Sequence, residues 1–124
     1  MKLLLDTHTA LWFTEDSASL TRPAIDAIED AANVILLSAV VPWEIAIKRA
    51  LGKIATTDEY LRLLRVAGAA DLPVTIAHAQ AVEALPHHHR DPFDRLLVAQ
   101  AQAENAAIVT GDARIARYDV PVIW

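Results

Sequence analysis

The chain has 124 residues, contains no cysteine and carries a formal net charge of −5 at pH 7. This length suits a single domain over residues 1–124, and the lack of cysteine excludes a disulfide framework and thiolate metal sites, as expected for a protein of the reducing cytoplasm. The acidic balance disfavours a sequence-reading DNA-binding module, which needs a basic surface to contact phosphates. It argues less against a metal-dependent nuclease, because metal-binding acids themselves add negative charge.

Apolar runs alternate with amphipathic stretches along the chain. The run at residues 2–6 has no polar alternation, which is typical of a buried strand, and it is too short for a signal peptide or a membrane span. In chain order, the patterns predict a strand over 2–6, a helix over 7–13, a helix over 23–31, a strand over 33–38, a helix from a Ser38 cap to about Gly52, a helix over 57–67, a strand over 72–75, a helix ending at Leu85, a helix over 91–104, a strand over 106–110 and a short strand over 121–123. This alternation predicts an α/β fold, with an open parallel sheet of four to five strands flanked by helices on both faces.

Four carboxylates, which we call the acidic quartet, lie just beyond predicted strands or early in the helices that follow them. The acidic quartet is Asp6, Glu44, Asp94 and Asp112. In a parallel sheet the carboxyl ends of the strands lie along one edge, and ligand crevices form there. Acids gathered at that edge raise each other's pKa unless a cation neutralises them. The pattern therefore predicts a site for a hard divalent metal, suited to phosphoester chemistry.

Each of these acids also has an ordinary structural interpretation. Asp6 can cap the helix that follows it, although Thr7 can cap that helix equally well and leave Asp6 free. Asp112 follows Thr110 and Gly111 and suits a turn. Glu44 can be a solvated helix acid, but its apolar neighbours on the helix indicate that it faces inward, where an unpaired carboxylate is costly. Four separate coincidences at one edge are less plausible than one shared metal site.

The segment Asp91-Pro92-Phe93-Asp94 holds two acids with different expected roles. Asp91 precedes a proline at the first helical position, which is a strong N-cap signature. Asp94 lies on the helix face that it shares with Leu97 and Val98, the predicted buried side. We therefore predict capping for Asp91 and metal ligation for Asp94.

The run His87-His88-His89-Arg90 is not predicted to be a metal site. Consecutive histidines cannot all face one ion, and hard Mg²⁺ prefers oxygen ligands. A surface loop is expected there, with Arg90 and also Arg95 available to hold phosphate. His8 is expected to pack rather than to touch substrate. The three tryptophans are expected in the core or at an interface rather than as base-stacking platforms.

These segments together resemble a PIN-domain protein, and specifically the VapC-type ribonuclease toxins of bacterial and archaeal toxin–antitoxin pairs. The Asp-Pro-Phe-Asp-Arg stretch is the specific part of the resemblance, whereas the lone acids are weak signals individually. The segments that carry the resemblance span nearly the whole chain in the expected order: Leu3 to His8, Trp43 to Ala46, His89 to Ala101, Val109 to Asp112 and Val120 to Trp124.

The resemblance implies a PIN-like fold in which the acidic quartet holds one or two Mg²⁺ or Mn²⁺ ions. Thr110 would be the polar residue that many relatives have beside the last acid, and Asp91 is extra to the simplest four-acid pattern. An RNA substrate, a homodimer and a small VapB-like antitoxin, whose tail places a basic residue in the acidic pocket, are also implied. Two ions could serve the attacking and leaving oxygens together, and one ion with an acid as general base is the alternative.

The predicted helix over residues 57–67 is apolar on nearly two faces, whereas an isolated surface helix needs only one apolar stripe. The hydrophobic fraction of the chain is 54%. Both features indicate association through this helix, with a second copy or with an antitoxin. The apolar positions are Tyr60, Leu61, Leu63, Leu64 and Val66.

Three rival functions fit parts of the pattern. A receiver domain of a response regulator matches the length and the acidic Mg²⁺ site, but it requires an Asp after the third strand, and residues 72–75 end without one. A haloacid-dehalogenase-type phosphatase needs a second Asp two residues after Asp6, where this chain has His8. A PIN fold that binds a partner or RNA without cutting is the third, and the intact acids argue against it.

Overall fold

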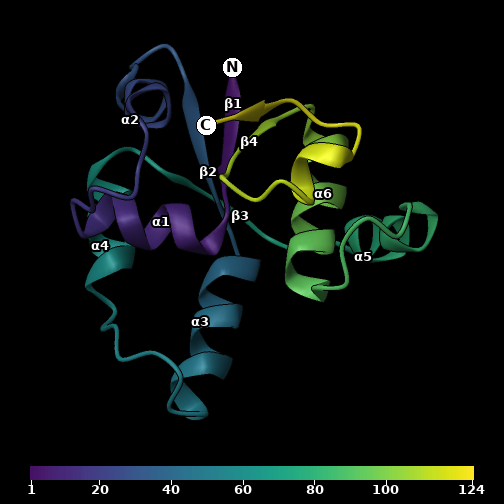
Figure 1. Ribbon diagram of the computed structural model, residues 1–124, viewed down its shortest axis with the longest axis horizontal. Coiled ribbons are helices and arrows are strands. Elements are labelled where there is room, and N and C mark those ends of the chain that lie inside the picture. Colours follow the sequence, from purple (N-terminus) through teal and green to yellow (C-terminus); the bar gives the residue numbers. More distant parts are fainter.

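The computed structural model describes residues 1–124 and is built around one parallel sheet of five strands (Figure 1). The strands lie in the spatial order β3-β2-β1-β4-β5, and every neighbouring pair is parallel. Their bounds are β1 Lys2–Leu5, β2 Val34–Ser38, β3 Ala70–Leu72, β4 Ala107–Val109 and β5 Val122–Ile123. The predicted α/β fold with an open parallel sheet is confirmed.

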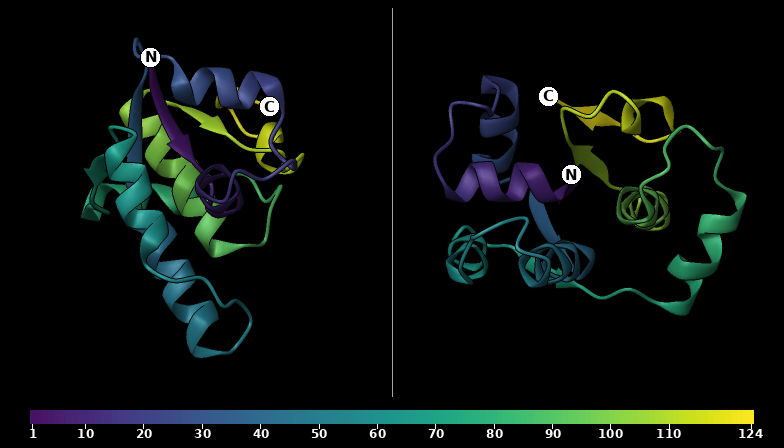
Figure 2. Two further views of the ribbon diagram at one scale, coloured as in Figure 1. Left: turned by 90° about the vertical axis from the view of Figure 1, so that its left-hand side faces the viewer. Right: turned by 60° about the horizontal axis from the view of Figure 1, so that its bottom comes forward.

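Helices cover both faces of this sheet, as Figures 1 and 2 show. Their bounds are α1 Thr7–Thr14, α2 Arg22–Glu29, α3 Val40–Ala50, α4 Glu59–Val66, α5 Ile76–Ala81 and α6 Pro92–Glu104, with short 3-10 turns η1 Val82–Ala84 and η2 Ile115–Arg117. In Figure 1, α1, α2 and α4 lie on one side of the strands and α5 and α6 on the other, while α3 contacts both α1 and α6. No helix of the structure combines the length and the hydropathy that a membrane-spanning segment requires.

Successive leucines of β1 pack on opposite faces of the sheet, because side chains alternate along a strand. Leu3 and Leu5 belong to a core cluster that includes residues of α1, α2, α3 and α4. Leu4 belongs to a second cluster with residues of α6 and η2. Burial on both faces explains why the sequence of β1 has no polar alternation.

The order of the sheet reverses between β1 and β4. Strands β2 and β3 lie on one side of β1, whereas β4 and β5 lie on its other side. Leu5 of β1 pairs with Val109 of β4, so the residues that follow these two strands emerge side by side. Open α/β sheets place their ligands at such switch points. Asp6 and Asp112, which follow the two strands, are therefore brought to one edge of the sheet.

The third strand lies earlier than predicted, at Ala70–Leu72 rather than over 72–75. Pro73 follows it and has no N–H to donate to a neighbouring strand, so pairing stops there. Thr75 instead caps α5, and its hydroxyl oxygen accepts the His78 N–H at 3.1 Å.

Ser38 is not the N-cap of α3, because the helix begins one residue later, after Ala39. The Ser38 hydroxyl is nevertheless used at this junction. Its oxygen accepts the Val40 N–H at 3.1 Å, and the hydroxyl donates to the buried Gln100 side chain of α6. Ser38 therefore ties β2 and the start of α3 to the helix on the opposite face.

Candidate metal centre

Asp6 follows β1 directly and serves two neighbours with its two oxygens. Its Oδ1 accepts the Thr9 N–H at 2.8 Å, which satisfies a free donor in the first turn of α1. Its Oδ2 accepts the hydroxyl of Thr110, which lies just beyond β4. The alternative in which Thr7 caps this helix is wrong, because the Thr7 hydroxyl donates to Glu44 Oε1 at 2.6 Å. Asp6 caps α1 and still faces the other acids.

Glu44 is buried in α3, as its apolar neighbours indicate. Besides the contact with Thr7, its Oε2 lies 2.5 Å from Lys48 Nζ, one helical turn along. The hydrogen bond to Glu44 is the main cause that raises the pKa of Lys48, so Lys48 stays protonated at neutral pH. The sequence interpretation missed Lys48, although Glu followed by Lys four residues later on a helix was the available signal.

Asp91 and Asp94 divide between structure and site. Asp91 caps α6 as predicted, because its Oδ1 accepts the Phe93 N–H at 2.8 Å and the Asp94 N–H at 3.3 Å. The Asp94 carboxyl is then free to face the rest of the acidic quartet. Its pKa is raised to about 8, first by burial and then by the charges of Asp91 and of the other three acids. Asp94 therefore keeps its proton at neutral pH in the metal-free protein.

His89 lies among the acids, so the prediction of a simple surface loop is wrong at this residue. Its buried Nε2 is 2.9 Å from Oδ2 of both Asp94 and Asp112. Its Nδ1 accepts the Asp91 N–H at 3.1 Å, so a neutral ring carries its proton on Nε2 and donates it toward these two carboxyl oxygens. The one sequence signal for this role of His89 was its position two residues before Asp91, the N-cap of α6, where the ring can accept the Asp91 N–H.

Asp112 lies in the turn after β4 and is held from both sides. Its N–H donates to the Thr110 hydroxyl oxygen at 3.0 Å, and its Oδ1 accepts the Arg114 N–H at 2.8 Å. Burial is the largest single effect and would raise its pKa, but the hydrogen bonds from Arg114 and His89 together outweigh burial and lower it. At neutral pH, Asp112 is therefore ionised while the neighbouring Asp94 is protonated.

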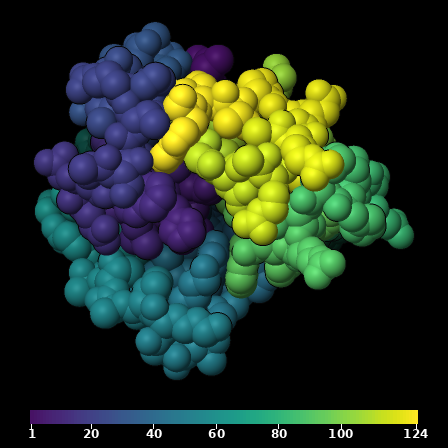
Figure 3. Space-filling view, in the orientation of Figure 1, coloured from purple at the N-terminus to yellow at the C-terminus, as the bar shows by residue number.

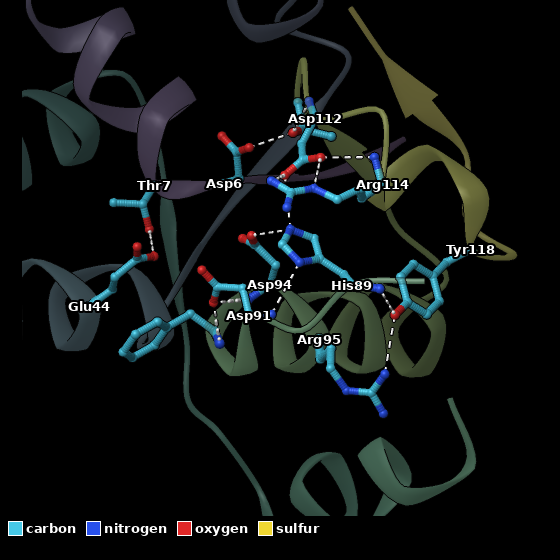
Figure 4. Close-up of polar contacts among 12 residues, drawn as sticks. Asp6, Thr7, Glu44, His89, Asp91, Asp94, Arg95, Asp112, Arg114 and Tyr118 are labelled. Atoms are coloured by element: carbon cyan, nitrogen blue, oxygen red, sulfur yellow. Dashed lines mark hydrogen bonds and ion pairs between the residues drawn. The ribbon is translucent and has the colours of Figure 1, made fainter. Parts of the chain in front are cut away.

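The acidic quartet converges on one small cavity, which we call the acidic cavity. Figure 4 shows Asp6, Asp94 and Asp112 directed toward a common region from three different elements, with His89 between the last two. The cavity has a volume of about 110 Å³ and no hydrophobic residue in its lining. Its lining residues are Asp6, Thr7, His8, Glu44, Lys48, His89, Asp91, Asp94, Asp112 and Arg114.

The residues of the acidic cavity fit a hard divalent ion. Carboxylate oxygens are the donors that Mg²⁺ and Mn²⁺ prefer. The pKa of Asp94 is raised first by burial and then by the charges of Asp91 and the other three acids, and a bound cation would offset these charges. Ligand atoms of His89, Asp94 and Asp112 lie within 4.8 Å of one another, close enough to surround a single ion.

Arg95 does not face the acidic cavity, and its predicted phosphate contact is corrected. Its buried guanidinium donates to the carbonyl oxygen of Pro86 at 2.9 Å and to Tyr118 Oη at 3.2 Å. Tyr118 Oη also accepts the His89 N–H at 3.0 Å. Arg95 and Tyr118 therefore hold the loop that carries His89. Arg90 is exposed, and its phosphate contact stays a prediction.

Comparisons with known proteins agree with this architecture. The family model of the PIN domain matches residues 3–121. A chain in the crystal structure of VapBC2 from Rickettsia felis, bound to a DNA fragment from their promoter, aligns with a TM-score of 0.70 over 98% of this chain and 97% of that chain. The two sequences are 17% identical, so this likeness concerns the fold. A search of curated proteins gives no significant match.

Proposed function

The chain belongs to the PIN-domain family, and from this premise we propose that it is a divalent-metal-dependent endoribonuclease that hydrolyses RNA phosphodiester bonds. The observation that carries the proposal is the acidic cavity, in which four carboxylates converge at the switch point of the sheet. Family membership also sets aside the receiver-domain and phosphatase alternatives. A non-cutting PIN fold is the remaining rival, and it is addressed by experiment below.

In this proposal the acidic quartet holds one or two Mg²⁺ or Mn²⁺ ions. When bound, a divalent ion supplies a water that ionises near neutral pH and compensates charge on the phosphate oxygens. Asp112 is already ionised at neutral pH, whereas Asp94 would release its proton as it becomes a ligand. Asp91 would serve as the cap that presents Asp94, since its Oδ1 is used by the start of α6.

The remaining polar side chains would hold the acids in position. Thr110 donates to one oxygen of Asp6, and Thr7 donates to one oxygen of Glu44. The second oxygen of Asp6 accepts the Thr9 N–H, and the second oxygen of Glu44 accepts from Lys48. Lys48 neutralises Glu44 and reduces the repulsion within the acidic quartet. Hydrogen bonds of this kind commonly orient metal ligands and tune their affinity.

We also propose that the protein is the toxin of a toxin–antitoxin pair with a small VapB-like antitoxin. The fold shared with a chain of the Rickettsia felis VapBC2 structure supports this assignment. A basic side chain of the antitoxin would be attracted to the acidic cavity, where Lys48 already pairs with Glu44. A homodimer and a cytoplasmic location belong to the same proposal.

The test is incubation of the purified protein with total RNA in Mg²⁺, in Mn²⁺ and in EDTA. We expect cleavage with either metal and none in EDTA, with activity restored when metal is returned in excess. An Asp26→Asn variant is a matched control, because Asp26 pairs with Arg22 on the exposed surface of α2. RNA binding with no cleavage under any metal condition would favour the non-cutting PIN fold.

A further inference from the structure

A second cavity, which we call the aromatic cavity, opens beside the acidic cavity. Its volume of about 430 Å³ is within the range typical of small-ligand sites, roughly 300–1,000 Å³. The two cavities share Asp6, His8, Asp112 and Arg114 in their linings. A ligand in the aromatic cavity is therefore within reach of a metal ion held by the acids.

Three aromatic rings line the aromatic cavity. His8 stacks on Trp12 with ring centroids 5.4 Å apart and an interplanar angle of 17°, and Trp12 lies 6.0 Å from Trp124. His8 was expected to pack, and it does stack on Trp12, but its side chain stays exposed to solvent. Trp12 and Trp124 pack against the core as expected, but they also line this cavity. Figure 3 shows that α1 (purple) and the C-terminal segment (yellow), which carry these rings, border one another on the surface.

The position of Trp124 is coupled to the turn that carries Asp112. A Cβ at Gly111 would lie only 2.7 Å from Trp124 Cε2, so the indole rests directly on the glycine backbone. Gly111 is followed by Asp112, whose N–H is fixed by Thr110. A group that stacks on Trp124 is therefore held at a set position relative to the metal centre.

We propose that the aromatic cavity binds a nucleobase of the RNA, from the nucleotide next to the phosphate that a metal ion at the acids would contact; this deepens the ribonuclease activity proposed above and rests on it. Proteins recognise single-stranded RNA by stacking unstacked bases on aromatic side chains. Arg114 lies at the border of both cavities with its side chain 63% exposed, 3.3 Å from Asp112 Oδ1. Its remaining N–H groups can donate to a phosphate or to a base edge.

Once a divalent ion is bound at the acids, the groups at this border match RNA better than a basic peptide. An RNA strand presents an anionic phosphate and an aromatic base within one nucleotide, which matches a metal centre, an exposed guanidinium and aromatic rings in adjoining cavities. A basic peptide could pair with Asp6 and Asp112, but it carries no phosphate for a divalent ion or for Arg114.

The test compares variants of the aromatic cavity on a short single-stranded RNA. His8→Ala and Trp12→Leu are expected to raise KM about 10-fold with kcat unchanged, because stacking is binding energy shared by substrate and transition state. Trp12→Phe should restore most of the affinity. Trp43→Leu is the matched control, since Trp43 is exposed on α3, pairs with Phe93 and does not line the cavity. His8 is exposed, so His8→Ala should fold normally. The KM of that variant therefore decides the test even if Trp12→Leu fails to fold.

A second readout does not depend on cleavage. In Ca²⁺, a tetraribonucleotide should quench the tryptophan fluorescence of the parent and of Trp43→Leu, and an analogue without bases should not. Quenching without cleavage would support the base-binding subsite and contradict the proposed nuclease activity. Cleavage with the parental KM in both cavity variants would contradict the subsite and support the nuclease activity. Quenching by tetra-arginine but not by the tetraribonucleotide would reassign the cavity to a basic peptide and overturn the inference.

Discussion

At the residue scale, a carboxylate can cap a helix and still belong to the acidic cavity, because it has two oxygens. Asp6 gives Oδ1 to the Thr9 N–H and Oδ2 to Thr110. Asp91 gives Oδ1 to α6 and still lines the acidic cavity. From the sequence, capping and metal ligation were treated as alternatives for each acid. For Asp6 the two roles are compatible.

Removal of one charge from the acidic quartet should separate activity from stability. We expect Asp6→Asn and Glu44→Gln both to abolish metal-dependent RNA cleavage. The metal-free Asp6→Asn protein should be no less stable, because the change relieves repulsion among like charges, whereas Glu44→Gln should stay folded but lose stability, because it removes the ion pair with Lys48. Asp6→Asn also retains an oxygen that can cap α1. Cleavage assays and thermal melting in EDTA check this, and cleavage at the parental rate in either variant would show that the residue is not a ligand.

The raised pKa of Asp94 predicts how the stability of the metal-free protein depends on pH. The unfolded chain loses the Asp94 proton near the ordinary value of 3.8, whereas the folded protein keeps it up to about 8. The folded state therefore binds more protons across this window, and this group's contribution to stability is lost as pH rises toward 8. Melting temperatures in EDTA from pH 5 to 8 should fall less steeply for Asp94→Asn. Equal slopes in variant and parent would contradict the assignment.

At the element scale, the start of α6 should respond differently to changes in its two acids. Asp91→Ser should keep stability and cleavage, because serine accepts the same backbone N–H, whereas Asp91→Ala should cost about 1 kcal/mol of stability. Asp94→Asn should lose most cleavage and weaken Mn²⁺ binding without loss of the helix. Titration with Mn²⁺ and chemical denaturation separate these effects. An inactive but folded Asp91→Ser would make Asp91 a fifth acid of the site.

Helix α4 divides its apolar residues between core and surface more sharply than its sequence suggests. Tyr60 and Leu64 are buried, whereas Leu61 lines an open groove of about 410 Å³ and Val66 is 74% exposed. We expect Leu61→Glu to stay folded and to lower self-association or antitoxin binding. Leu64→Glu should unfold the protein, because it buries a charge without a partner. Light scattering, with Ala67→Glu as the exposed control, checks this; a parent that is monomeric and has no partner would count against an interface here.

At the scale of the whole molecule, a metal that binds only the folded state should stabilise it. By mass action, a ligand at 100 times its Kd adds roughly 2.7 kcal/mol to the free energy of unfolding. We expect Mn²⁺ to raise the melting temperature of the parent and of Asp26→Asn, and to do so much less for Asp94→Asn. An equal rise in all three proteins would locate the ion outside the acidic cavity.

Most of the helices and strands, and much of the local chemistry, follow from residues that are close together in the chain. Apolar runs without alternation mark strands buried on both faces, as at Lys2–Leu5, and the Asp91-Pro92 pair marks the start of α6. These features depend on residues close together in the chain, so pattern and propensity suffice to find them. The quartet could be proposed for the same reason, since strand ends in a parallel sheet share one edge.

Contacts between side chains of distant segments could not be predicted in this way, because they arise when the chain folds. The hydrogen bond from Thr110 to Asp6 needs β1 and β4 to be neighbours, and the place of His89 between Asp94 and Asp112 needs a loop that Arg95 and Tyr118 hold in position. Local pattern does not encode such contacts, because they depend on strand order and on how buried polar groups find their partners. The aromatic cavity likewise exists only because the folded chain brings α1 beside the residues that follow β4 and β5.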